Sequence, residues 1–201
     1  MQFITLILFS LLLFSCSEKR LPYYSNLDLK PEESSTHTIA DFEFVDQNAD
    51  TLSNSIVDGK IYIADFFFTT CQGICPDMTN NLLKIQRKFL DKSDLQILSF
   101  SVDPKNDTSE ALKNYTTKMK ITSKNWHLFT GEKRKLYELA SKSFFAGELK
   151  YFDEEESFIH SENIYLVDPN KQIRGVYDGT ESKEMKRLIV DIELLRTEFT
   201  K

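Results

Sequence analysis

The sequence is poor in positive charge and in the residues that most often bind metals. Against 31 Asp and Glu there are 25 Lys and Arg, which gives a net charge of −6, and the 201 residues include three Cys and three His. A nucleic-acid partner is not expected, because phosphate binding needs clustered Lys and Arg. No internal repeat is visible, and the length suits one domain with a substantial core.

The apolar run at residues 3–14 is too short to cross a bilayer, which takes about 20 residues, but it suits a secretory signal. It ends in Leu13-Phe14-Ser15-Cys16 and is followed by polar residues, an arrangement that resembles a bacterial lipobox. We interpret residues 1–15 as a lipoprotein signal peptide and Cys16 as the lipidated N-terminus, which places the domain on the periplasmic face of a membrane. No Lys or Arg precedes the run, so an uncleaved anchor and a cytosolic protein are kept as alternatives.

Once Cys16 is assigned to the anchor, Cys71 and Cys75 are the only thiols left. Two thiols with three residues between them, in an extracytoplasmic protein, predict a disulfide, a redox pair or a metal site. Cys75 precedes Pro76, which suits the first turn of a helix, so the helix dipole is expected to lower the pKa of the Cys75 thiol. Soft sulfur ligands select Cu(I), and imidazole suits copper too.

Two regions follow the predicted signal peptide. Residues 16–37 contain Pro22, Pro31 and several charges without a helical or strand period. We interpret them as a tether with a reach of at most about 70 Å. The ordered pattern begins at residue 38, so residues 38–201 are predicted to form the folded domain.

Within this domain, the hydrophobic pattern predicts an α/β fold. Alternation over residues 39–45, a turn at 46–50 and a following strand form an opening hairpin. Buried strands are predicted at 60–68, 95–102 and 126–129, late strands at 163–167 and 172–177, and helices at 76–89, 107–119, 132–143 and 181–199. A reactive pair after the first central strand, at a helix N-terminus, is the thioredoxin arrangement. We therefore predict a thioredoxin-like fold with an N-terminal β-hairpin and a late antiparallel hairpin.

A third metal ligand must come from one of the three histidines. His37 lies in the predicted tether, and His127 falls in a short strand where a packed core residue is expected. His160 precedes the late hairpin, in a loop after the acidic run at residues 153–156. In a thioredoxin fold this loop faces the reactive cysteines, so His160 is the candidate.

Four segments resemble the SCO/SenC family in order and spacing. They are residues 66–78 (FFFTTCQGICPDM), 101–108 (SVDPKNDT), 126–131 (WHLFTG) and 160–169 (HSENIYLVDP). The resemblance covers about residues 36 to 195. Many members have His before the first motif Cys and Pro-Asp after it, where this chain has Thr70 and Gln72-Gly73. Those positions are not ligands, so the metal site is expected to be kept.

The resemblance implies that Cys71, Cys75 and His160 bind copper, as Cu(I) with Cu(II) also considered. It implies a role in assembling the copper A centre of cytochrome c oxidase, by giving copper, by reducing the client's cysteines, or both. The implied partners are the copper-bearing oxidase subunit and other copper carriers. Cys71 and Cys75 are also expected to act as a redox pair that can close as a disulfide.

Several alternatives are weaker. A structural disulfide would gain little, because so short a loop loses little entropy on cross-linking. A thiol–disulfide oxidoreductase usually has two intervening residues and a preceding Trp, where this chain has three and Thr70. A peroxiredoxin needs Pro and Thr at the positions held by Phe68 and Gln72. A zinc site would be one ligand short of the usual four.

Overall fold

The computed structural model describes residues 20–90, 92–147 and 161–199. Cys16, His160, the predicted signal peptide and the acidic run at 153–156 lie outside this part of the chain. Within the described residues, no helix combines the length and apolarity that crossing a membrane requires.

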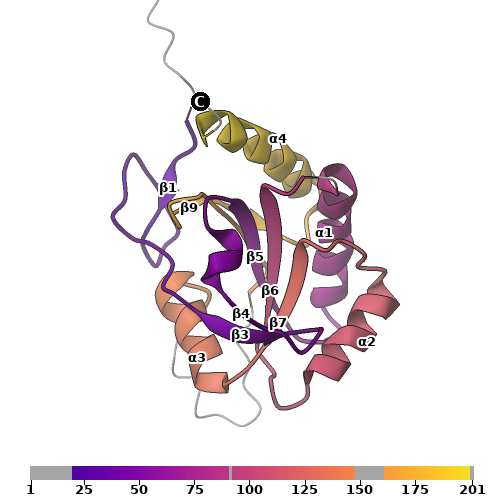
Figure 1. The fold of residues 1–201 in the computed structure, drawn as a ribbon. Coiled ribbons are helices and arrows are strands. Elements are labelled where there is room, and N and C mark those ends of the chain that lie inside the picture. The colour runs from indigo at the N-terminus through magenta and orange to yellow at the C-terminus, as the bar shows by residue number, and fades with distance from the viewer. Residues whose placement is uncertain (1–19, 91, 148–160, 200–201) are drawn as a thin grey trace, which may run out of the picture.

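A seven-stranded mixed sheet forms the centre of the domain (Figure 1). Its order is β4-β3-β7-β6-β5-β8-β9. The three central strands, β5 (Ile61–Phe67), β6 (Leu95–Ser101) and β7 (Trp126–Thr130), are parallel. The hairpin β3 (Glu43–Asp46) and β4 (Thr51–Ser53) pairs antiparallel with β7, and the hairpin β8 (Asn163–Val167) and β9 (Ile173–Asp178) pairs antiparallel with β5.

Helices connect the strands and cover both faces of the sheet (Figure 1). They are α1 (Cys75–Phe89), α2 (Ser109–Met119), α3 (Lys133–Glu138), α4 (Ser182–Phe199) and a short 3-10 helix at Asn54–Val57. The helix predicted over 132–143 is α-helical only to Glu138 and continues as a π-helical turn, Leu139–Ser143. In this turn, the Ser143 hydroxyl accepts a hydrogen bond from the backbone N–H of Ala40. The predicted thioredoxin-like α/β fold and both of its hairpins are otherwise confirmed.

Alternate residues of β5 point to opposite faces of the sheet, as the period of a strand requires. The odd-numbered residues Ile61, Ile63 and Phe67 pack in the core cluster with α1, α2 and α4. The even-numbered residues Tyr62, Ala64 and Phe66 pack with α3 in a second cluster on the other face. This cluster is rich in aromatic rings and also contains Phe100, Phe129 and Phe144. Every residue of β5 is therefore buried, as its continuous apolar sequence predicts for a central strand.

Asp65 is a buried carboxyl group on the face of β5 that packs against α1. It is 2% exposed and accepts a hydrogen bond from the Ser99 hydroxyl (2.5 Å), which in turn accepts one from the Trp126 indole N–H (3.0 Å). Burial raises the pKa of Asp65 to about 7, because the charged form loses its hydration. Three neighbouring strands are thus joined by one chain of side-chain hydrogen bonds.

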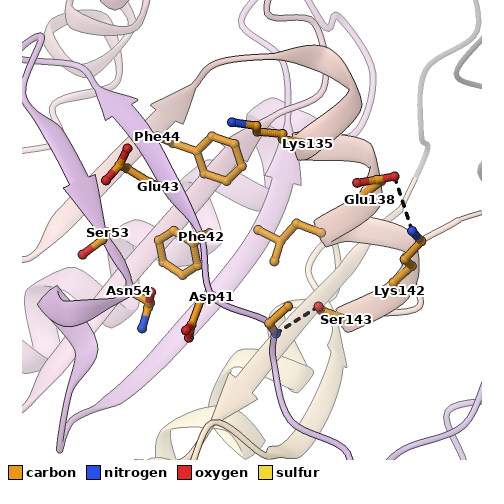
Figure 2. A pocket seen from close by; sticks show the side chains of 12 residues that line it. Asp41, Phe42, Glu43, Phe44, Ser53, Asn54, Lys135, Glu138, Lys142 and Ser143 are labelled. Atoms are coloured by element: carbon orange, nitrogen blue, oxygen red, sulfur yellow. Dashed lines mark hydrogen bonds and ion pairs between the residues drawn. The ribbon is translucent and has the colours of Figure 1, made fainter.

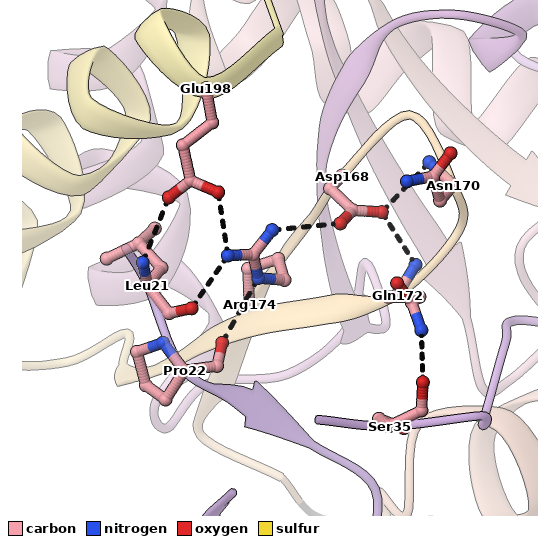
Figure 3. A network of polar contacts seen from close by, with 8 residues as sticks. All are labelled: Leu21, Pro22, Ser35, Asp168, Asn170, Gln172, Arg174 and Glu198. Atoms are coloured by element: carbon pink, nitrogen blue, oxygen red, sulfur yellow. Dashed lines mark hydrogen bonds and ion pairs between the residues drawn. The ribbon is translucent and has the colours of Figure 1, made fainter. Parts of the chain in front are cut away.

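Arg174, on β9, is a buried cation with carboxylates on two sides (Figure 3). Its guanidinium contacts Asp168 (3.1 Å) and Glu198 at the end of α4 (2.8 Å). It also donates to the carbonyl oxygens of Leu21 (2.6 Å) and Pro22 (3.2 Å). The backbone N–H of Leu21 donates to Glu198 as well (2.9 Å). We call these five residues the Arg174 clamp.

The clamp changes the interpretation of the predicted tether. Tyr23 lies under the Arg174 guanidinium, 4.3 Å from ring centroid to Cζ, and Leu21 is buried in the core. Directly after Leu21 and Pro22, two short strands, β1 (Tyr23–Tyr24) and β2 (Pro31–Glu32), pair antiparallel with each other. The described part of residues 16–37 is thus folded against the domain. The tether prediction missed this because the clamp's partners are more than 150 residues away in sequence.

We expect Arg174→Met to lower the free energy of unfolding by about 3–5 kcal/mol, because it leaves two carboxylates without their buried cation. Lys142→Ala is the control, since Lys142 forms an exposed ion pair with Glu138 (3.3 Å) and such pairs contribute at most about 1 kcal/mol. Urea denaturation of both variants measures the difference. Equal losses would show that the clamp contributes no more than a surface ion pair.

Asp65 predicts a pH-dependent stability. The unfolded carboxyl ionises near pH 4, whereas the folded one keeps its proton until about pH 7. The contribution of Asp65 to the free energy of unfolding is therefore complete below pH 4. It decreases as the pH rises from 4 to about 7, because only the unfolded chain loses the proton in this range. Asp65→Asn should remove this fall and gain about 1–4 kcal/mol relative to wild type between pH 4 and 7. If the free energies of unfolding of the two proteins changed with pH in the same way across this range, the assignment would be contradicted.

Candidate functional site

The two predicted site cysteines lie where β5 passes into α1. The connecting loop is residues 68–74, and α1 begins at Cys75 with Pro76 in its first turn. Cys71 is partly exposed, and its backbone N–H donates to the carbonyl oxygen of Phe68 (3.3 Å). Cys75 is 4% exposed. Both are free thiols, and their side chains are close enough for each to affect the ionisation of the other.

The Cys75 thiol is not activated in the way that its position at the helix start predicts. Burial, together with the neighbouring Cys71 thiol, raises its pKa to about 12, although a backbone hydrogen bond at Phe68 acts to lower it. The expectation of a lowered pKa is wrong, because the loss of hydration outweighs the helix dipole. Cys71 is the sulfur that a partner can reach from solvent.

A buried carboxylate, Asp107, fixes the start of the cysteine loop. It is fully buried and accepts hydrogen bonds from the Thr69 backbone N–H (3.2 Å), the Thr69 hydroxyl (2.5 Å) and the Ser101 hydroxyl (2.6 Å). Thr69 stands two residues before Cys71, and Ser101 ends β6. The loop is therefore held to the end of the neighbouring strand by three hydrogen bonds to one side chain.

Sequence reasoning did not identify Asp107 and Thr69 as partners. Both lie in segments that carry the family resemblance, which is the one signal that singles them out. They are 38 residues apart, so only the pairing of β5 with β6 brings them together. The neighbouring Asp103 forms a turn, as its position before Pro104 suggests: its carbonyl oxygen accepts from the backbone N–H groups of Asn106 and Asp107.

Two of the three histidines are hydrogen-bonded away from the cysteine loop. His37 Nε2 contacts the carbonyl oxygen of Ser143 (2.8 Å). His127 Nδ1 contacts Asp46 (3.3 Å), and His127 is partly exposed rather than packed in the core as predicted. His160 lies outside the described residues. Among the residues that the structure describes, no three His, Cys, Asp or Glu side chains converge as metal ligands.

The chain nevertheless enters β8 at the edge of the sheet where the cysteine loop lies. β8 runs antiparallel to β5, with Tyr165 opposite Ala64 and Val167 opposite Tyr62. The start of β8 is thus beside the end of β5. Ser161, the first described residue of this part of the chain, is buried and accepts a hydrogen bond from the backbone N–H of Asn163 (3.2 Å).

A groove of about 580 Å³ lies elsewhere, between the β3–β4 hairpin and α3 (Figure 2). Phe42, Phe44 and Leu139 line it together with charged side chains such as Lys135 and Glu138. Neither cysteine lines this groove. The thiol pair is therefore separate from this groove, with Cys71 partly exposed in the loop and Cys75 buried at the start of α1.

Sequence comparison matches the SCO1/SenC family over residues 30–194. The SCO1 protein homolog of Bacillus subtilis (strain 168) is 31% identical over 189 residues, which cover 93% of this chain and 92% of the relative. A putative copper-binding protein of Stutzerimonas stutzeri is 29% identical over 155 residues, covering 75% of this chain and 72% of the relative.

Solved structures give the same result. A SCO1/SenC family lipoprotein from Bacillus anthracis has a TM-score of 0.70 and 30% identity, covering 80% of this chain and 95% of that one. BsSco, described as a member of the Sco family of cytochrome c oxidase assembly proteins with a disulfide switch, has a TM-score of 0.69 and 33% identity. That match covers 80% of this chain and 94% of BsSco. The chain therefore belongs to the SCO1/SenC family.

Proposed function

We propose that this protein binds copper through Cys71, Cys75 and His160 and takes part in assembling the copper A centre of a cytochrome c oxidase. The observation that carries the proposal is the pair of adjacent free thiols at the start of α1, in a loop held by Asp107. Two relatives support the chemistry, one described as a putative copper-binding protein and one as a cytochrome c oxidase assembly protein.

The donor set fits copper better than the alternatives. Two sulfurs and one imidazole are soft or borderline ligands, which Cu(I) prefers and which leave zinc one ligand short. Partial exposure of Cys71 leaves the site open to a partner that gives or takes the ion. Cu(I) is the expected state, and Cu(II) binding is a further possibility that the same three side chains allow.

The described start of β8 supports the assignment of His160 as the third ligand. His160 directly precedes Ser161, and the chain enters β8 beside the end of β5. His37 and His127 have other partners, which leaves them as comparison residues for experiment.

The proposal includes a lipid anchor at Cys16 that holds the domain on the periplasmic face of a membrane. It rests on the apolar run at residues 3–14, the Leu-Phe-Ser-Cys sequence that ends it and the lipoprotein description of the Bacillus anthracis relative. In this position the site would face the compartment in which the oxidase subunit and other copper carriers would meet it.

A second candidate function is reduction of the client's cysteines, and the closeness of the two free thiols favours it. In this reaction Cys71 attacks the client disulfide and forms a mixed disulfide with one of its sulfurs. Cys75 then attacks Cys71, which forms the Cys71–Cys75 disulfide and releases the client. The two thiols lose two electrons and two protons, which the client disulfide gains as it becomes two thiols. This route needs Cys71 and Cys75 but not His160.

For the copper site, we expect one Cu(I) per wild-type monomer and loss of binding in Cys71→Ser and Cys75→Ser. His160→Ala should weaken binding more than about tenfold, since it removes a ligand rather than an outer hydrogen bond. His37→Ala and His127→Ala are matched controls that should bind as wild type. Competition with a Cu(I) chelator in reducing buffer measures all five variants.

Unchanged affinity in His160→Ala, or an equal loss in His127→Ala, would refute the ligand assignment. The same variants separate the two functions in cells that lack the native protein. Copper delivery requires that His160→Ala fails to restore oxidase assembly. Full restoration by His160→Ala would instead assign the protein to thiol reduction.

Asp107→Asn should weaken Cu(I) binding by about 10- to 100-fold, because side chains that orient a metal site contribute this much. An amide cannot accept all three hydrogen bonds that the carboxylate accepts. Asp77→Asn is the control, since it removes the same charge two residues from Cys75 but from an exposed side chain. Equal effects of the two changes would show that charge near the site, and not the position of the loop, sets the affinity.

A further inference from the structure

Three large hydrophobic side chains, on α4 and directly after α1, are exposed to solvent. Leu90 follows the last turn of α1, Phe199 ends α4, and Val190 lies on the outer side of α4. Their side chains are 47%, 39% and 62% exposed, respectively. In Figure 1, α4 is the outermost element at this end of the molecule. We call these three residues the apolar edge.

Polar contacts place the ends of α1 and α4 together at this edge. Arg196, three residues before Phe199, pairs with Asp94 at the start of β6 (2.8 Å). The carbonyl oxygen of Asp94 in turn accepts from the N–H of Ile61, the first residue of β5 (3.1 Å). Leu90 and Phe199 therefore lie where the parallel strands begin, and the cysteine loop lies where β5 ends.

The chain that leads to Cys16 leaves the domain at the same edge. The Arg174 clamp holds Leu21 against Glu198, the residue before Phe199. Only five residue steps separate Leu21 from Cys16, and they span at most about 18 Å when fully extended. The reach of about 70 Å expected for a 20-residue tether is thus reduced roughly fourfold.

We propose that the apolar edge rests on the lipid bilayer, with the cysteine loop pointing away from it. This inference depends on the lipid anchor at Cys16 that the proposed function includes. A lipid held within about 18 Å of the edge brings the bilayer to Leu90, Val190 and Phe199 rather than to another face. The occupant of the edge is therefore the membrane surface.

Charge at the same end fits a membrane surface. Arg87 and Lys88 in the last turn of α1 and Lys92 after it are exposed, and Lys19 and Arg20 follow Cys16 in sequence. Basic side chains beside a bilayer gain about 1 kcal/mol each from anionic lipids. Apolar side chains flanked by Lys and Arg are the composition of interfacial segments.

The orientation has a consequence for the site. β5 has seven residues, so its two ends are roughly 20 Å apart. The Arg174 clamp, Leu90 and Phe199 lie at one end, and Cys71 at the other. The thiols would thus face the aqueous compartment at a fixed height, where a folded domain of a membrane-bound client can reach them.

The test uses the full lipidated chain in vesicles of phosphatidylethanolamine and phosphatidylglycerol that carry a small fraction of a nickel-chelating lipid. Spin labels are attached at Val190→Cys or at Gln72→Cys, each in a Cys71→Ser, Cys75→Ser background. Both positions are exposed; position 72 lies in the cysteine loop, and position 190 lies on the outer side of α4. We expect several-fold stronger paramagnetic broadening at position 190 than at position 72. This difference should shrink in the Leu90→Ser, Phe199→Ser double variant.

Equal broadening at the two positions, or stronger broadening at position 72, would overturn the proposed orientation. Dipolar coupling between position-190 labels in detergent, without vesicles, would assign the edge to a second copy of the chain and also overturn it. Failure of the chain to float with the vesicles would refute the lipid anchor, and this inference with it. Copper binding by the chain in solution would then be unaffected, so the two failures are distinguishable.

Discussion

The arrangement of the site depends on one buried carboxylate, Asp107. It accepts two hydrogen bonds from Thr69 and one from Ser101, and so joins the loop after β5 to the end of β6. An unmet buried carboxylate would be costly, so the loop that satisfies it is held in one position. Cys71 and Cys75 are consequently presented on a fixed frame, while Cys71 stays open to solvent.

A second buried charge organises the opposite end of the sheet. Arg174 holds the N-terminal segment and the last turn of α4 on β9. The two ends of the domain thus have separate roles: one fixes the thiols, and the other fixes where the chain departs toward Cys16. Replacing all members of a buried ion pair with apolar residues often costs no stability, although removing one member alone does. We therefore infer that the main contribution of Arg174 is to fix the position of the N-terminal segment.

The sequence was sufficient for the fold because each strand and hairpin has a local pattern, such as the continuous apolar run of β5. It was insufficient where an effect depends on distant residues. The pKa of Cys75 was misjudged because burial by the assembled core outweighs the local helix start. The tether was misjudged because Leu21 meets Arg174, 153 residues away. Cys71 and Cys75 were placed correctly at the helix start, whereas His160 and Cys16 remain predictions.

The proposed copper site requires that one imidazole joins the two sulfurs around a single copper ion. X-ray absorption spectroscopy of the Cu(I)-loaded protein tests it most directly, because it identifies the atoms bound to the metal. We expect two sulfur ligands and one nitrogen ligand in wild type, and loss of the nitrogen in His160→Ala. A nitrogen ligand that persists in His160→Ala, or a site with sulfur ligands alone in wild type, would contradict it.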